Sequence, residues 1–206
     1  MKKSIITMIL SAIIFVAGCG GVEDAEETAI GINRSGNITQ VLKEDFPTES
    51  YDSEKLITSV TAQVDEYNNS VGQEQVTLKE ADVKENKAVF ILQYKTDEDY
   101  RKFNSVDFFS GSVDQAVKEG YAFAGDFLSA AGNKTEPGVL PGKCMEEQVL
   151  IIREPYLIEV PGEILYVSAN VERLGEKQAK LQREEQELYE VPRPTTEAYG
   201  YVIYHK

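Results

Sequence analysis

The chain has no tryptophan and a single histidine, His205, next to the last residue. One histidine cannot supply a zinc site made of several histidines, and a Ser-His-Asp triad would depend on this terminal residue. The two cysteines, Cys19 and Cys144, form no Cys-x-x-Cys motif. We therefore expect His205 to be exposed or at a strand edge. We expect Cys144 to be a small buried hydrophobe and not a nucleophile.

Other signatures of catalysis are also missing. No Gly-rich phosphate loop occurs, and Gly-x-Ser-x-Gly and Ser-x-x-Lys are absent downstream of Cys19. The acidic residues 97–99 lack the spacing of a calcium-binding loop and are typical of a helix start. Many pairs of the 35 acidic residues could meet across a cleft as in a glycosidase, which makes that pattern unspecific. We predict no catalytic residue, no metal and no cofactor.

Positive charge is scarce. Lysine and arginine total 21 against 35 acidic residues, so the net charge is −14. Such a surface repels phosphate backbones, and no basic patch with interleaved aromatics offsets it, so we expect no nucleic-acid partner. Hydrophobic residues make up 42% of the 206 residues, which is enough for one sizeable domain. A cluster of aromatic residues between positions 94 and 127 is expected to fill that core.

The first residues, MKKSIITMILSAIIFVAGCGG, have the layout of a secretory signal peptide. Lys2 and Lys3 precede an apolar run from Ser4 to Val16. As a helix this run would be about 20 Å long, short of the ~30 Å of a hydrocarbon core. We therefore interpret residues 1–18 as a signal peptide and not as a permanent membrane span.

The end of this segment, Val16-Ala17-Gly18-Cys19, resembles the lipobox of bacterial lipoproteins, with an aliphatic residue, two small residues and a cysteine. The resemblance implies that Cys19 receives a diacylglyceryl group and that the chain is cut before it. Two acyl chains anchor a protein stably where one does not. The protein would then be held on the extracytoplasmic face of the cell membrane. Residues 19–27 would form a short acidic tether.

The stretches DFFSGSVDQAVKEGY and VPGEILYVSANV, together with the lipobox and the acidic tether, resemble uncharacterised lipoproteins of clostridia-like, low-GC Gram-positive bacteria. This resemblance implies a location and brings no activity or catalytic residue with it.

Beyond residue 27, local signals alternate between strands and helices. Two hairpins are predicted, with turns at residues 35–37 and 84–87. Short helices are predicted at residues 96–103 and 112–120, the second with a capping box formed by Ser112 and Gln115.

The strongest helix prediction covers residues 53–71. Asp52 or Ser53 can cap its start, and Gly72 can end it. Apolar residues recur on one face at helical spacing: Leu56, Val60, Val64, Tyr67 and Val71. We expect this stripe to pack against a sheet that includes Val89 and Ile91.

The last third of the sequence is rich in strands, with a Gly- and Pro-containing loop at residues 131–143 before it. We predict an α+β fold with a mixed or antiparallel sheet, one long amphipathic helix, short helices and a β-rich C-terminal part. Residues 28–206 would form a single domain, in one body or in two lobes joined near residues 131–143.

These patterns favour a non-enzymatic binding or accessory module of the cell envelope over the alternative, a carboxylate-dependent hydrolase of the envelope. The partners would be the membrane, through Cys19, and an envelope protein or extracellular ligand. The terminal segment YGYVIYH is either a free strand edge for such a partner or a strand already paired within the sheet.

Overall fold

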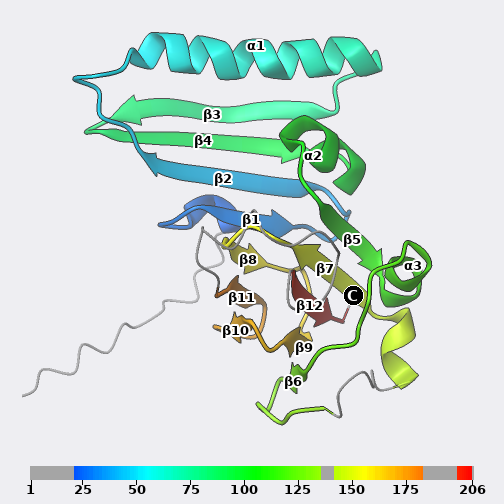
Figure 1. Ribbon diagram of the computed structural model, residues 1–206. Coiled ribbons are helices and arrows are strands. Elements are labelled where there is room, and N and C mark those ends of the chain that lie inside the picture. The colour runs from blue at the N-terminus through cyan, green and yellow to red at the C-terminus, as the bar shows by residue number, and fades with distance from the viewer. Residues whose placement is uncertain (1–20, 136–141, 183–198, 206) are drawn as a thin grey trace, which may run out of the picture.

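The structure is a computed structural model that describes residues 21–135, 142–182 and 199–205. These residues form two β-sheets with helices at their margins (Figure 1). The helices are η1 (Val22–Asp24), α1 (Ser53–Val71), α2 (Asp97–Asn104), α3 (Val113–Lys118) and η2 (Gly142–Glu146). The predicted α+β class is confirmed.

The larger sheet has seven strands in the order β10-β11-β8-β1-β2-β4-β3. It is mixed, because β1 runs parallel to β8 whereas its other pairings are antiparallel. Its strands are β1 (Ala29–Ile32), β2 (Ile38–Asp45), β3 (Val76–Lys84), β4 (Lys87–Tyr94), β8 (Leu157–Glu159), β10 (Val171–Arg173) and β11 (Gln178–Leu181).

The smaller sheet is antiparallel, with five strands in the order β5-β7-β12-β9-β6. Its strands are β5 (Phe108–Ser112), β6 (Phe127–Ser129), β7 (Gln148–Ile152), β9 (Ile164–Ser168) and β12 (Gly200–Tyr204). The two edge strands, β5 and β6, precede the loop at residues 131–143, and the three strands between them follow it, so both sides of the loop contribute to this one sheet. Residues 136–141 of that loop lie outside the described residues.

The position of β12 decides between the two readings of the terminal segment. The terminal strand pairs with β7 on one side and with β9 on the other, so it is not a free edge. All five of its residues are buried. The alternative reading, a strand paired inside its sheet, is confirmed.

The predicted turns and caps are found where local sequence places them. In the β1–β2 turn, the Asn33 side chain accepts hydrogen bonds from the amides of Ser35 and Asn37, and Gly36 has a φ of 86°. The β3–β4 turn places Glu85 and Asn86 at positive φ, as a two-residue hairpin turn requires.

Helix caps also follow the local sequence. The Asp52 side chain accepts a hydrogen bond from the amide of Lys55, and Gly72 ends α1 in the left-handed conformation. Ser112 and Gln115 form the predicted capping box of α3.

The α1 stripe packs against the seven-stranded sheet, but against the other face from the one expected. Val64 is buried in the same cluster as Phe90 and Leu92, while Ile91 belongs to a separate cluster on the opposite face. Successive residues of a strand point to opposite faces, so the expected pairing with Val89 and Ile91 was wrong by one residue. Strand β4 is apolar on both faces, and its alternation therefore could not identify the face that α1 covers. The stripe ends at Tyr67, because Val71 is 38% exposed.

Three buried clusters hold the layers together. The largest lies between the sheets and includes Ile30 and Phe90 of one sheet and Ile152 and Val202 of the other. A second cluster covers the outer face of the five-stranded sheet beneath α3. A third lies on the outer face of the seven-stranded sheet, where Val22 of η1 packs with Ala29, Val41 and Ile91.

The folded body therefore begins at Val22, inside the segment 19–27 that was expected to be a tether. Val22 is 7% exposed, and a Cβ on Gly31 would lie 2.6 Å from Val22 Cγ1, so only glycine leaves room for this valine. The acidic side chains of Glu23 and Asp24 are exposed, as expected.

Candidate functional site

The candidate binding site is a pocket of about 300 Å³ between segments that are distant in the sequence, which we call the inter-sheet pocket. Its walls come from the β1–β2 turn, the junction of β4 with α2, the β8–β9 turn, and the strands β5, β7 and β12. This volume is at the lower end of the range of small-molecule sites in proteins.

Two cationic side chains line this pocket. Arg34 lies in the β1–β2 turn and Lys95 directly follows β4; both are exposed. Neither forms an ion pair with any residue in the part of the chain that the structure describes. Asp97 is the one carboxylate in the lining. The pocket therefore offers two positive charges on a protein whose net charge is −14.

The inner part of the pocket contains neutral hydrogen-bonding groups. Tyr204 of β12 is 3% exposed, and its hydroxyl contacts the Ser110 hydroxyl. Burial raises the pKa of the Tyr204 hydroxyl, and the contact with Ser110 opposes that shift. Thr96 and Gln148 add further polar groups to the lining. Such groups can orient a polar ligand by hydrogen bonds.

The acidic residues at the start of α2 serve the helix itself. The Asp99 amide donates a 3.1 Å hydrogen bond to Thr96 Oγ1, which in turn donates to Asp99 Oδ2 at 2.6 Å. The Tyr67 hydroxyl donates to Asp99 Oδ1 at 2.9 Å. Burial and this contact raise the pKa of Tyr67 to about 12. The reading of residues 97–99 as a helix start is confirmed.

A second hollow, of about 450 Å³, lies between α1 and β3. Asn68 of α1 joins the two elements: its side chain donates to the Val76 carbonyl at 2.7 Å and accepts from the amides of Gln75 and Val76 at 2.9 Å. Figure 1 shows α1 running along β3, the last strand of the sheet. These contacts occupy backbone groups of β3 that would otherwise be open to a partner strand.

Glu154 is the described carboxyl whose pKa is raised, and burial is the main cause. It lies between β7 and β8, and its Oε2 has no hydrogen-bond partner. The charge of Asp107 raises this pKa further, and Asp107 itself accepts a 2.7 Å hydrogen bond from the Tyr199 hydroxyl. Neither residue lines the inter-sheet pocket or the α1–β3 hollow.

The remaining residues singled out in the sequence have structural surroundings. Cys144 is 3% exposed, and burial raises the pKa of its thiol, which confirms the small buried hydrophobe. His205 is exposed, with Nδ1 3.0 Å from Glu147 Oε2. The aromatic residues pack in the core as expected; Tyr100 and Phe108, for example, have ring centroids 4.6 Å apart. Cys19 lies outside the described residues.

Within the described ranges, no three His, Cys, Asp or Glu side chains are grouped closely enough to hold a metal ion. None of the helices in these ranges has the length and apolar character needed to cross a membrane. No family model, curated protein or solved structure matches the chain.

Sequence reasoning missed Arg34, Lys95, Asn68 and Glu154. The hairpins with turns at residues 35–37 and 84–87 were both predicted, and Arg34 and Lys95 lie in or beside them. Their meeting at one pocket depends on the order of strands, for which the sequence contains no local signal.

Proposed function

We propose that this protein is a lipid-anchored binding module on the extracytoplasmic face of the cell membrane and that it does not catalyse a reaction. The anchor rests on the lipobox-like Val16-Ala17-Gly18-Cys19 after a short apolar run. The observation that supports binding is the inter-sheet pocket, whose lining contains Arg34 and Lys95 and one carboxylate, Asp97. A partner or ligand with carboxylate or other anionic groups fits this lining.

The anchor can be tested by labelling cells with a radioactive fatty acid. The wild-type chain should take up label and partition into the membrane fraction. The Cys19→Ser variant should do neither. Equal labelling of the two proteins would contradict the proposed anchor.

The binding role can be tested by cross-linking in intact membranes followed by purification of the protein with its partners. The double variant Arg34→Ala/Lys95→Ala should lose the partner. Lys79→Ala/Lys177→Ala is the matched control, because it removes two exposed lysines that do not line the pocket. Equal loss in both variants would point to net charge and not to the inter-sheet pocket.

The second candidate, a carboxylate-dependent hydrolase of the envelope, is favoured by the raised pKa of Glu154, since general acids often have this property. It is disfavoured by the position of Glu154 outside both hollows. Turnover of peptidoglycan or glycan by the purified protein, abolished by Glu154→Gln, would replace the binding proposal.

A further inference from the structure

We infer that one particular face of the body lies against the lipid headgroups: the outer face of the seven-stranded sheet, which carries Val22, Val41, Ile91 and Lys180 and which we call the anchor face. This inference rests on the proposed lipidation of Cys19. It adds the orientation of the body, which the anchor alone does not give.

The first step is the length of chain between the lipid and the packed structure. Val22 is 7% exposed and packs on β1 and β2 with Ala29, Val41 and Ile91. Gly21 is already part of the η1 turn, because its carbonyl accepts a 3.1 Å hydrogen bond from the Asp24 amide. Three residues of fully extended chain, from Cys19 to Val22, span at most about 11 Å. The folded body can therefore move only a short distance away from the bilayer.

The second step is the side of the sheet on which η1 lies. Val41 and Ile91 are paired across β2 and β4, and both point away from the cluster between the sheets. On β11, Ala179 and Leu181 belong to that inner cluster, so Lys180 points to the outer face. There it forms an ion pair with Glu27. The acidic segment after η1 is thus fixed to the same face as Val22.

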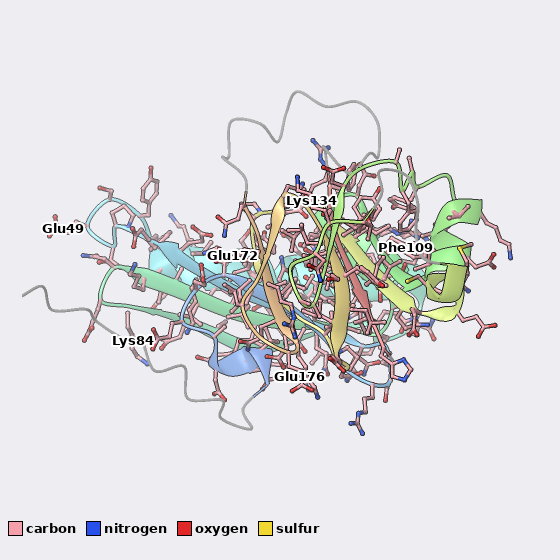
Figure 2. The ribbon with its side chains drawn as sticks, turned by 90° about the horizontal axis from the view of Figure 1, so that it is seen from below. Glu49, Lys84, Phe109, Lys134, Glu172 and Glu176 are labelled. Carbon is pink, nitrogen blue, oxygen red and sulfur yellow. The ribbon has the colours of Figure 1, made fainter. Side chains whose placement is uncertain are left out.

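The third step is the separation of the two sides of the molecule. Figure 2 shows η1, drawn in blue, and Glu176 on one side, with Lys134 and Glu49 on the opposite side. Two packed sheets are about 10 Å apart, and the loops beyond them add to that distance. The segment from Cys19 to Val22, at most about 11 Å long, joins the body on the anchor face. It therefore cannot bring the side of Lys134 equally close to the headgroups.

The charges nearest to the lipid attachment indicate which lipid surface the anchor face fits. Four exposed acidic residues lie close to Val22 in the sequence: Glu23, Asp24, Glu26 and Glu27. Among the residues that the structure describes, only Glu27 of these four forms an ion pair, with Lys180 of β11. Anionic headgroups repel such a cluster at low ionic strength, whereas zwitterionic headgroups do not. The anchor face therefore fits a zwitterionic surface better than an anionic one.

The test uses the full lipidated chain in vesicles of phosphatidylcholine that contain a lipid with a nitroxide on its headgroup. A fluorophore is attached at Glu176→Cys on the anchor side, or at Lys134→Cys or Glu49→Cys on the far side. All three positions are exposed, and Cys144 is buried and so protected from the label. Glu49→Cys is the matched control for Glu176→Cys, because both remove one glutamate.

We expect the nitroxide to quench the label at Glu176→Cys several-fold more than the labels at the two far-side positions. A spacer of about 20 Gly and Ser residues between Gly20 and Gly21, with a mean span of about 25 Å, should largely abolish that difference. Replacing part of the lipid by phosphatidylglycerol at low salt should weaken the quenching at Glu176→Cys, and added salt should restore it.

The outcomes distinguish a failure of the proposed orientation from a failure of the proposed lipid anchor. A chain that does not float with the vesicles contradicts the lipidation of Cys19, and the orientation with it. A chain that floats but shows equal quenching at near and far positions overturns the orientation alone. Stronger quenching at Glu176→Cys on anionic vesicles at low salt overturns the preference for zwitterionic lipid.

Discussion

The two sheets differ in how completely the rest of the molecule covers them. Every residue of β12 is buried, because one face lies on the cluster between the sheets and the other lies beneath α3 and its aromatic neighbours. In β3, at the end of the seven-stranded sheet, Val76 is the one fully buried residue. A strand covered on both faces has nearly continuous apolar sequence, whereas a strand covered on one face can alternate. The effect of a mutation should therefore depend on the strand's place in its sheet and not on its place in the chain.

The largest effect is expected at Val202, in the middle of the five-stranded sheet. Val202→Asp places an unpaired charge where no water reaches, which costs about 3–5 kcal/mol. Val89→Asp, on the anchor face of β4, lies between Lys43 of β2, which would attract the new charge, and Asp82 of β3, which would repel it. This half-buried position should cost about 1 kcal/mol. Urea unfolding of residues 21–206 measures both values.

Equal costs at Val202 and Val89 would show that the two sheets do not differ in coverage. Deleting residues 199–206 extends the comparison, because it removes β12 altogether. We expect the shortened chain to lose cooperative unfolding. If the shortened chain still folds, the terminal strand is not required for the fold and becomes a candidate site for a partner.

The next effect concerns the single helix that covers the open end of the seven-stranded sheet. Val64→Asp should cost about 3 kcal/mol, because Val64 is 6% exposed. Val60→Asp, at a half-buried position, should cost less. Val71→Asp should change stability by no more than about 0.5 kcal/mol, since Val71 is 38% exposed. Thermal melting ranks the three variants, and a cost at Val71 as large as that at Val64 would show that the stripe extends through the last turn.

A smaller effect is expected at Asn68, which binds the backbone of β3. Asn68→Ala leaves the Gln75 and Val76 amides and the Val76 carbonyl without this partner, at a cost of about 1–3 kcal/mol. Asn69→Ala is the matched control at the next, exposed position. Hydrogen exchange at the Val76 amide should accelerate in the first variant only. Unchanged exchange in Asn68→Ala would mean that this end of β3 is protected by packing alone.

The smallest effect is expected at Glu154, in the link between the sheets. Burial raises the pKa of its carboxyl in the folded state, so the folded protein holds its proton to higher pH than the unfolded chain. Stability contributed by the protonated form is therefore lost as the pH rises from the unfolded-state pKa through the folded-state pKa. Glu154→Gln should raise the melting temperature at neutral pH and have little effect below about pH 4. A lower melting temperature at neutral pH would show that the ionised carboxylate stabilises the fold.

Features encoded by neighbouring residues could be predicted from the sequence. Asp52 and Gly72 bound α1, Thr96 caps α2, and Ser112 with Gln115 starts α3, because each cap depends on residues within one turn. The strand order could not be predicted. The β1–β8 pair joins residues 29–31 to residues 157–159 and leaves no local signal.

The candidate site was less accessible to prediction than the fold. The inter-sheet pocket brings Arg34, Lys95 and Tyr204 together only after both sheets have formed. The raised pKa of Glu154 likewise depends on a distant element, since the charge of Asp107 adds to the effect of burial and Asp107 is itself hydrogen-bonded to Tyr199. The contrast agrees with the physics of each feature, since a cap needs one turn of chain and a pocket needs the whole topology.

The central position of β12 also determines when the molecule can fold. The strand that joins β7 to β9 is the last of the described strands to be synthesised, and until then the five-stranded sheet is split into the pair β5–β7 and the pair β6–β9. The seven-stranded sheet is also incomplete until late, because β1 lacks its partner on one side until β8 has been synthesised. Partly synthesised chains therefore expose apolar strands that have no partner. The five-stranded sheet can therefore close only after all of its described strands have been made.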